Sequence, residues 1–123
     1  MPNVISISDH NFEDEVEDYK DKPVLVLFYT RNGKPCQTFR AIFNKISETH
    51  EQHFKFVSID CDVYTANSKE IANNVFPSVA AFNQGKMISV QKGATDITYF
   101  SGYVNRILSQ QRKAQALAKG NQP

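Results

Sequence analysis

The chain has 123 residues, of which 41% are hydrophobic and 22% are charged, and these values are typical of one soluble globular domain. Its formal net charge of +1 predicts neither a nucleic-acid-binding protein nor one that binds anionic membranes. Its two cysteines, Cys36 and Cys61, are too few for a disulfide-rich secreted domain and do not have the spacing of a zinc site.

The N-terminal residues lack the basic segment and the long apolar run of a secretory signal peptide. The longest apolar run, residues 24–29, is too short to cross a bilayer. We therefore predict an intracellular, cytoplasmic protein that does not bind membranes. Import into an organelle is the alternative if the chain begins at a processing site.

Strands and helices are predicted to alternate in the first part of the chain. Residues 4–8 are short and β-branched, which favours an edge strand. Ser8 or Asp9 is suited to cap a helix that ends near residue 19. Residues 24–29, with the sequence VLVLFY, predict a strand that is buried on both faces.

The middle of the chain continues this alternation. A helix is predicted to begin in the sequence GKPC and to end within residues 49–53, and its apolar residues recur at helical spacing: Phe39, Ile42, Phe43 and Ile46. Residues 54–60 predict another strand. Residues 67–70, with the sequence NSKE, match the capping box of a short helix that ends near Asn73.

A hairpin and a long helix are predicted to follow. Residues 78–82 and 87–91 predict two strands that are joined by a turn at residues 83–86. One side of the last helix is apolar and is formed by Ile97, Phe100, Val104, Ile107 and Leu108. The resulting order, β-α-β-α-β-α-β-β-α, predicts an α/β fold in which helices flank a central mixed sheet.

The chain is expected to contain a single folded domain. We assign residues 1–111 to this domain, because no linker or repeat interrupts them. Residues 112–123 form a basic helical extension in this interpretation, with a frayed tail at residues 120–123.

Several landmarks, in the correct order over residues 4–108, resemble the thioredoxin family. They are Lys22-Pro23-Val24-Leu25-Val26 with Phe28, Pro35-Cys36, Ile59-Asp60, Phe76-Pro77-Ser78, Phe82-Asn83-Gln84-Gly85-Lys86 and Gly93-Ala94. The resemblance implies a thioredoxin fold. It also implies a cis peptide bond before Pro77 and, beside it, a groove in which an extended peptide can bind.

The active-site motif departs from the family pattern. The family's Trp-Cys-Gly-Pro-Cys corresponds here to Asn32-Gly33-Lys34-Pro35-Cys36, so Gly33 takes the place of the attacking cysteine. Leu27 and Phe56 take the places of a buried aspartate and of a lysine near it. The resemblance therefore implies that the attacking thiol, its aromatic neighbour and the proton-handling pair are all replaced around an atypical GKPC motif.

Disulfide exchange needs a thiolate that attacks and a second thiol that resolves the mixed disulfide. Because glycine has no side chain, the intramolecular dithiol cycle is excluded at this motif, and Cys36 is the only candidate catalytic thiol. A helix start and Lys34 favour its thiolate, whereas the inward orientation implied by the resemblance shields it. We expect an inert core cysteine, with a reactive thiol as the alternative, and we expect Cys61 to be a free thiol at a distant strand end.

The leading hypothesis is a thioredoxin-like protein that binds a protein or peptide partner and is not a reductase. The residues expected to line the groove are Arg31, Asn32, Gly33, Lys34, Pro35, Phe76, Pro77, Gly93 and Ala94. Arg31 and Lys34 would give this groove a basic rim that favours acidic or polar segments. No cofactor is expected, and no metal site either, because His50 and His53 lack a convergent third ligand.

Two alternatives belong to other functional classes. A monothiol disulfide oxidoreductase would form mixed disulfides with glutathione or a protein through Cys36, in cell redox homeostasis. A subunit of a larger assembly would instead dock through the basic C-terminal helix, which contains good helix formers.

Overall fold

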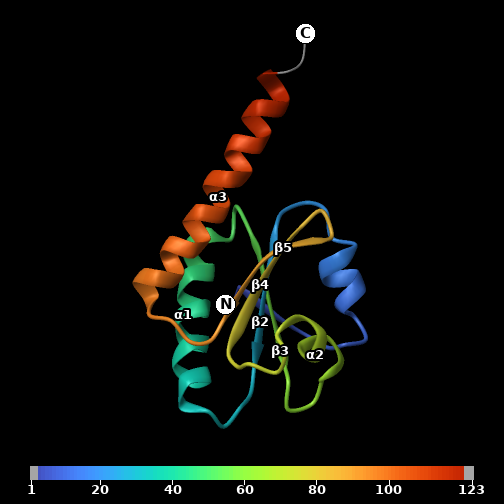
Figure 1. The fold of residues 1–123 in the computed structure, drawn as a ribbon, viewed down its shortest axis with the longest axis vertical. Helices are drawn as coiled ribbons and strands as arrows, with labels where there is room; N and C mark the ends of the chain where they lie inside the picture. The colour runs from blue at the N-terminus through green and yellow to red at the C-terminus, as the bar shows by residue number, and fades with distance from the viewer. Residues whose placement is uncertain (1–2, 121–123) are drawn as a thin grey trace.

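The computed structural model describes residues 3–120, in which helices cover both faces of a five-stranded sheet (Figure 1). The elements are β1 (Val4–Ile7), the π-helix η1 (Glu13–Glu17), β2 (Val24–Tyr29), α1 (Lys34–His50), β3 (Lys55–Asp60), α2 (Ala66–Ile71), β4 (Ser78–Asn83), β5 (Lys86–Lys92) and α3 (Ile97–Gly120). Their order confirms the predicted alternation of strands and helices.

The strands lie in the order β1-β3-β2-β4-β5. β1, β3 and β2 are mutually parallel, whereas β4 and β5 run antiparallel to their neighbours. This mixed sheet confirms the predicted fold class. β2 is central and all of its residues are buried, as its continuous apolar sequence predicts.

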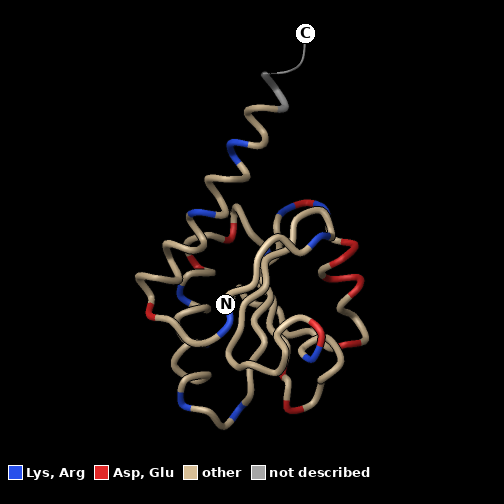
Figure 2. Tube along the Cα trace, in the orientation of Figure 1, with Lys and Arg blue, Asp and Glu red and all other residues tan. Residues whose placement is uncertain are grey.

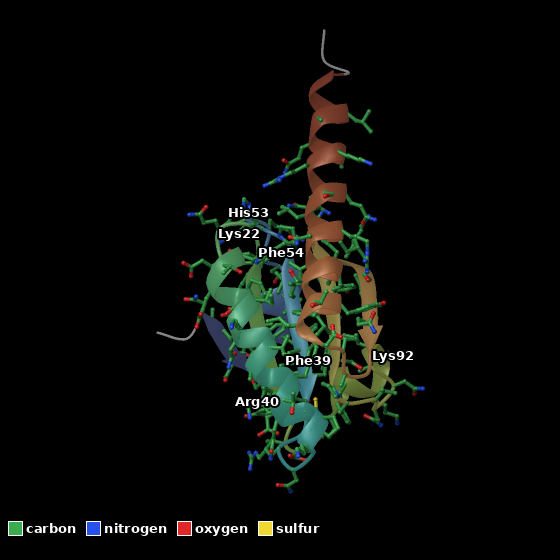
Figure 3. The ribbon with its side chains drawn as sticks, turned by 90° about the vertical axis from the view of Figure 1, so that its left-hand side faces the viewer. Lys22, Phe39, Arg40, His53, Phe54 and Lys92 are labelled. Atoms are coloured by element: carbon green, nitrogen blue, oxygen red, sulfur yellow. The ribbon has the colours of Figure 1, made fainter. Side chains whose placement is uncertain are left out.

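The sheet separates two hydrophobic cores. On one face α1 and α3 pack together (Figure 3). There the Phe39 and Phe100 rings meet edge to face with centroids 5.0 Å apart. On the other face η1 and α2 cover a second core that contains Phe12 and Val16. Because successive strand residues face opposite sides, β1, β2, β3 and β4 contribute to both cores.

The first helix differs from the prediction. It is one turn of π-helix, Glu13–Glu17, in which the Asp18 amide donates to the Glu13 carbonyl at 2.7 Å. The chain before it is a turn rather than helix, because the Asn11 side chain accepts a hydrogen bond from the Ser8 amide at 2.7 Å. The short turn still buries Phe12 and Val16, which are one helical turn apart.

Asp9 caps a different helix from the one predicted. Its carboxylate accepts hydrogen bonds from the amides of Ala66 (3.1 Å) and Asn67 (3.3 Å), at the start of α2, and from the Asn67 side chain (2.8 Å). α2 therefore begins before the predicted capping box, and none of its own side chains caps it. The sequence could not reveal this contact, because it joins segments far apart in the chain.

Replacing Asp9 by alanine is expected to lower the free energy of unfolding by about 1–2 kcal/mol, because α2 loses its cap. Urea denaturation provides the measurement, and Asp14→Ala is the control, since Asp14 is an exposed acid on η1. Equal small effects of both substitutions would show that Asp9 does not hold α2.

The hairpin between β4 and β5 confirms the predicted turn. Gln84 and Gly85 have φ angles of 53° and 79°, the pair of left-handed residues that a tight two-residue hairpin requires. A Cβ at Gly85 would clash with the Glu17 carbonyl oxygen, so this position requires glycine.

Helix α3 extends well beyond the sheet (Figure 1). It continues through the predicted domain boundary at residue 111 and includes Gly120, while residues 121–123 of the predicted tail lie outside the described residues. Docking through this extension stays a prediction. No helix within residues 3–120 has the length and apolarity needed to cross a bilayer.

Candidate functional site

The turn after β2 and the loop before β4 are brought together by the pairing of these two strands. Phe28 lies opposite Ser78 in the β2–β4 register, so the chain segments beyond both residues are neighbours. The first leads through residues 30–33 into α1, and the second contains Phe76 and Pro77. Residues that were predicted to line a groove therefore gather at this end of the sheet.

Gly33 is the N-cap of α1, with an extended backbone, and Pro35 lies in the first helical turn. The Gln37 amide donates to the Gly33 carbonyl at 3.0 Å, which closes that turn. This geometry directs Cys36 toward the sheet. The cysteine is only 2% exposed and is part of the core between α1 and α3.

The side-chain direction at position 33 points toward Cys36. A Cβ placed on Gly33 would lie 3.9 Å from the Cys36 Cβ, 4.0 Å from its Sγ and 3.8 Å from the Thr30 Oγ1. The Thr30 hydroxyl is itself 3.6 Å from the Cys36 sulfur. Thr30 is thus a hydrogen-bond partner of the thiol, and it was not among the predicted site residues. Thr30 directly follows the apolar strand β2, and this position in the sequence could have indicated that its hydroxyl lies near the motif.

The loop before β4 borders the turn. The peptide bond between Phe76 and Pro77 is cis, and the Gly93 amide donates to the Pro77 carbonyl at 2.8 Å. Pro77 is buried, Phe76 is half-buried and Ala94 is exposed. Among residues 3–120, no backbone group pairs with the amide or the carbonyl of Phe76. These two groups can therefore pair with an added extended segment.

Arg31 does not give the groove the free charge that was predicted. Its Nε donates to the Asp60 carboxylate at 2.6 Å, and its amide donates to the Asp62 carboxylate at 2.7 Å. The hydrogen bond to Asp60 raises the pKa of the guanidinium above its usual value. Arg31 also lines a cavity with β1 residues. Because Arg31 is paired with Asp60, Lys34 is the cation of this turn that has no ion-pair partner among the described side chains.

The sequence profile of the Thioredoxin family matches residues 3–106 of the chain. The chain belongs to the thioredoxin family.

Individual thioredoxins are moderately similar to the chain. Thioredoxin Y2, chloroplastic, of Arabidopsis thaliana is 33% identical over 85 residues, which cover 69% of this chain and 50% of that protein. Thioredoxin Y, chloroplastic, of Oryza sativa subsp. japonica is 29% identical over 106 residues, which cover 86% of this chain and 59% of that protein. Thioredoxin of Porphyra purpurea is 26% identical over 107 residues, which cover 87% of this chain and 99% of that protein. The chain thus spans about half the length of the chloroplastic relatives and nearly all of the algal one.

The positions that the thioredoxin resemblance assigns to a buried acid and a lysine are apolar in three dimensions as well as in sequence. Leu27 and Phe56 are 2% and 1% exposed and belong to the same core as Cys36. Leu25, next to Phe56 in the register, is also fully buried. Neither side chain can exchange a proton with the Cys36 thiol.

Cys61 lies on the opposite side of the sheet from Cys36, in the core beneath η1 and α2. Both cysteines are free thiols, as predicted. Burial raises the pKa of Cys61 to about 11, although hydrogen bonds from Ser68 and from the Tyr29 backbone act against this shift. The thiol is therefore protonated near neutral pH and cannot act as a nucleophile there.

In the native protein at pH 8, iodoacetamide is expected to label Cys36 and Cys61 roughly a hundredfold more slowly than in the unfolded chain. Burial is the cause for Cys36, and burial together with the raised pKa is the cause for Cys61. Mass spectrometry of the labelled peptides measures both rates. A Thr38→Cys variant is the positive control, because Thr38 is exposed on α1. Labelling of Cys36 as fast as that of the control thiol would contradict the prediction.

Proposed function

We propose that the chain binds an extended segment of a protein partner in the groove near Pro77, without dithiol–disulfide turnover. The groove is formed by the residue 31–35 turn, by Phe76 and Pro77, and by Gly93 and Ala94. One observation carries the proposal. A side chain at position 33 would point toward Cys36, but this position holds a glycine and therefore has no thiol. Position 33 supplies no thiol and Cys61 lies on the opposite side of the sheet, so a mixed disulfide on Cys36 cannot be resolved within the chain.

The binding part of the proposal is supported by the open backbone at Phe76. Its unpaired amide and carbonyl can hydrogen-bond with an extended partner, and this mode of recognition needs no thiol. Lys34 is exposed at the rim and has no carboxylate partner among residues 3–117. It favours a segment that carries an acidic or polar residue.

The burial of Cys36 argues against the single-thiol alternative. A thiol that is 2% exposed must move before glutathione or a protein disulfide can reach it. We also propose a reducing, intracellular compartment, which the two free thiols support.

The wild-type protein is expected to reduce insulin at the background rate of the dithiol donor, because Gly33 supplies no attacking sulfur. In quantitative affinity capture, Cys36→Ser is expected to keep the partners that the wild type retains. Ala94→Arg is expected to recover about tenfold less of these partners, or less still, because the arginine side chain would occupy the exposed side of the groove.

Ala41→Arg is the matched control, because Ala41 is exposed on α1 outside the groove. Insulin turnover above background would overturn the proposal. So would partners that are lost with Cys36→Ser and kept with Ala94→Arg, since these would be held by the thiol.

A further inference from the structure

The outer edge of β5 is open. In the sheet order β5 is the last strand and pairs only with β4, so alternate backbone amides and carbonyls along its other edge have no strand to pair with. Met87 and Ile88 on this strand are 49% and 43% exposed. An exposed edge that carries apolar side chains is suited to accept another strand.

A hollow lies beside this edge. It has a volume of about 320 Å³ and is lined by Ile88, Ser89, Val90, Gln91, Tyr103, Arg106, Ile107 and Gln110. The Tyr103 hydroxyl donates to the Ser89 Oγ at 2.9 Å, which holds α3 against β5. Figure 3 shows Lys92 of β5 on the side of α3 away from α1, so α3 forms one wall and β5 the other.

Both walls are cationic. β5 and α3 contain no Asp or Glu, whereas lysines flank β5 at Lys86 and Lys92 and Arg106 lines the hollow. Figure 2 shows the same contrast, with acidic residues gathered on η1 and basic residues along α3. Among the side chains that the structure describes, the ion pairs are Arg31–Asp60 and Lys55–Glu15, so Arg106 has no carboxylate partner.

The lysines of β5 disfavour a second copy of this chain as the molecule that pairs with the open edge. If two β5 strands paired antiparallel about a two-fold axis centred on Ser89, the Lys86 end of each strand would meet the Lys92 end of the other, within the one-residue register shift that β5 has at Ile88. Like charges directly opposite each other in a sheet destabilise the pairing. An acidic segment of a different protein would instead neutralise both lysines and Arg106.

We propose that the edge of β5, together with the hollow beside α3, binds an extended acidic segment of a partner protein as a sixth strand. The segment runs antiparallel to β5, and its side chain opposite Ser89 enters the hollow and places a carboxylate on Arg106. This site is separate from the groove at Pro77. Ile107 and Gln110 in its wall lie beyond residue 106, where the family match ends, so the continuation of α3 completes the site.

The probe for this site is the labelled peptide acetyl-Glu-Thr-Val-Glu-Val-Thr-Glu-amide, which matches the 7 residues of β5. Fluorescence anisotropy is expected to show saturable binding, with affinity that falls as salt rises. The peptide with Lys in place of Glu is expected to bind at least about tenfold more weakly. N-methylation of alternate amides on the pairing edge is expected to abolish binding, and hydrogen exchange is expected to show new protection in β5.

Arg106→Gln is expected to weaken binding about fivefold, because the carboxylate loses its charged donor. Arg112→Gln is the matched control, since Arg112 lies on the same helix but lines a different cavity, and it is expected to change binding less than about twofold. The proposal is overturned by absence of saturable binding at millimolar peptide, by equal losses in both variants, or by protection outside β5. Concentration-dependent dimers that protect β5 would also overturn it in favour of a second copy.

Discussion

Gly33→Cys is expected to give the protein a dithiol that it lacks. The added Cβ would lie 3.9 Å from the Cys36 Cβ, within the range of about 3.5–4.5 Å that disulfides adopt. The φ angle of Gly33 is −83°, which any residue adopts, and no atom beyond the neighbouring residues 32 and 34 lies closer than 3.8 Å to the new Cβ. The new thiol would lie at the N-terminus of α1, where the helix dipole favours the thiolate.

The variant is expected to form an intramolecular disulfide on oxidation and to reduce insulin at roughly ten times the wild-type rate or more. Mass spectrometry after alkylation detects the disulfide, and turbidity measures insulin reduction. Gly33→Ser controls for size, and the Gly33→Cys/Cys36→Ser double variant controls for the resolving thiol. A variant that stays folded but forms no disulfide would show that the two positions do not face each other.

Leu27→Asp is expected to be among the most destabilising single substitutions in the chain. Leu27 is 2% exposed and lies in a core of mainly apolar side chains that contains no Lys, Arg or His to compensate a carboxylate. The loss of leucine packing and the burial of a charge together are expected to lower the free energy of unfolding by about 4 kcal/mol or more at pH 7.

This loss depends on pH with a defined sign. Burial is expected to raise the pKa of the introduced aspartate in the folded state above its unfolded value of about 3.9. Between these two pKa values the folded chain keeps a proton that the unfolded chain has released, so stability falls as pH rises through this window. Urea denaturation of Leu27→Asp and Leu27→Asn from pH 4.5 to pH 7.5 measures the difference. Parallel pH profiles for the two variants would mean that the carboxylate reaches water.

The fold was predictable because its signals are local. The apolar run of β2, the helical spacing of Phe39 and Phe43, and the turn at Gln84 and Gly85 each depend on neighbouring residues. Backbone geometry and burial then allow few arrangements of a strand and helix pattern of this length. The position of the first helix was wrong, because Asn11 turns the chain before the predicted helix can begin.

For the candidate site, the sequence predicted which residue types are present but not how they are placed. The presence of Cys36 and the absence of a thiol at position 33 are facts of the sequence, and they limit the chemistry whatever the conformation. The burial of Cys36, the ion pair between Arg31 and Asp60, and the capping of α2 by Asp9 are contacts between distant segments. Such contacts follow from strand order and register, which no local pattern encodes.

The amino-acid order therefore fixes which groups this protein possesses: one thiol at the motif, no buried acid beside it, and no acid on β5 or α3. Folding fixes which of these groups can meet a partner. Packing in the core shields Cys36 from solvent. The backbone of Phe76 and the outer edge of β5 stay open, because Phe76 lies just before β4 begins and β5 is the last strand of the sheet. The physical reason is that covalent composition is independent of conformation, but access and pairing arise only when distant segments pack together.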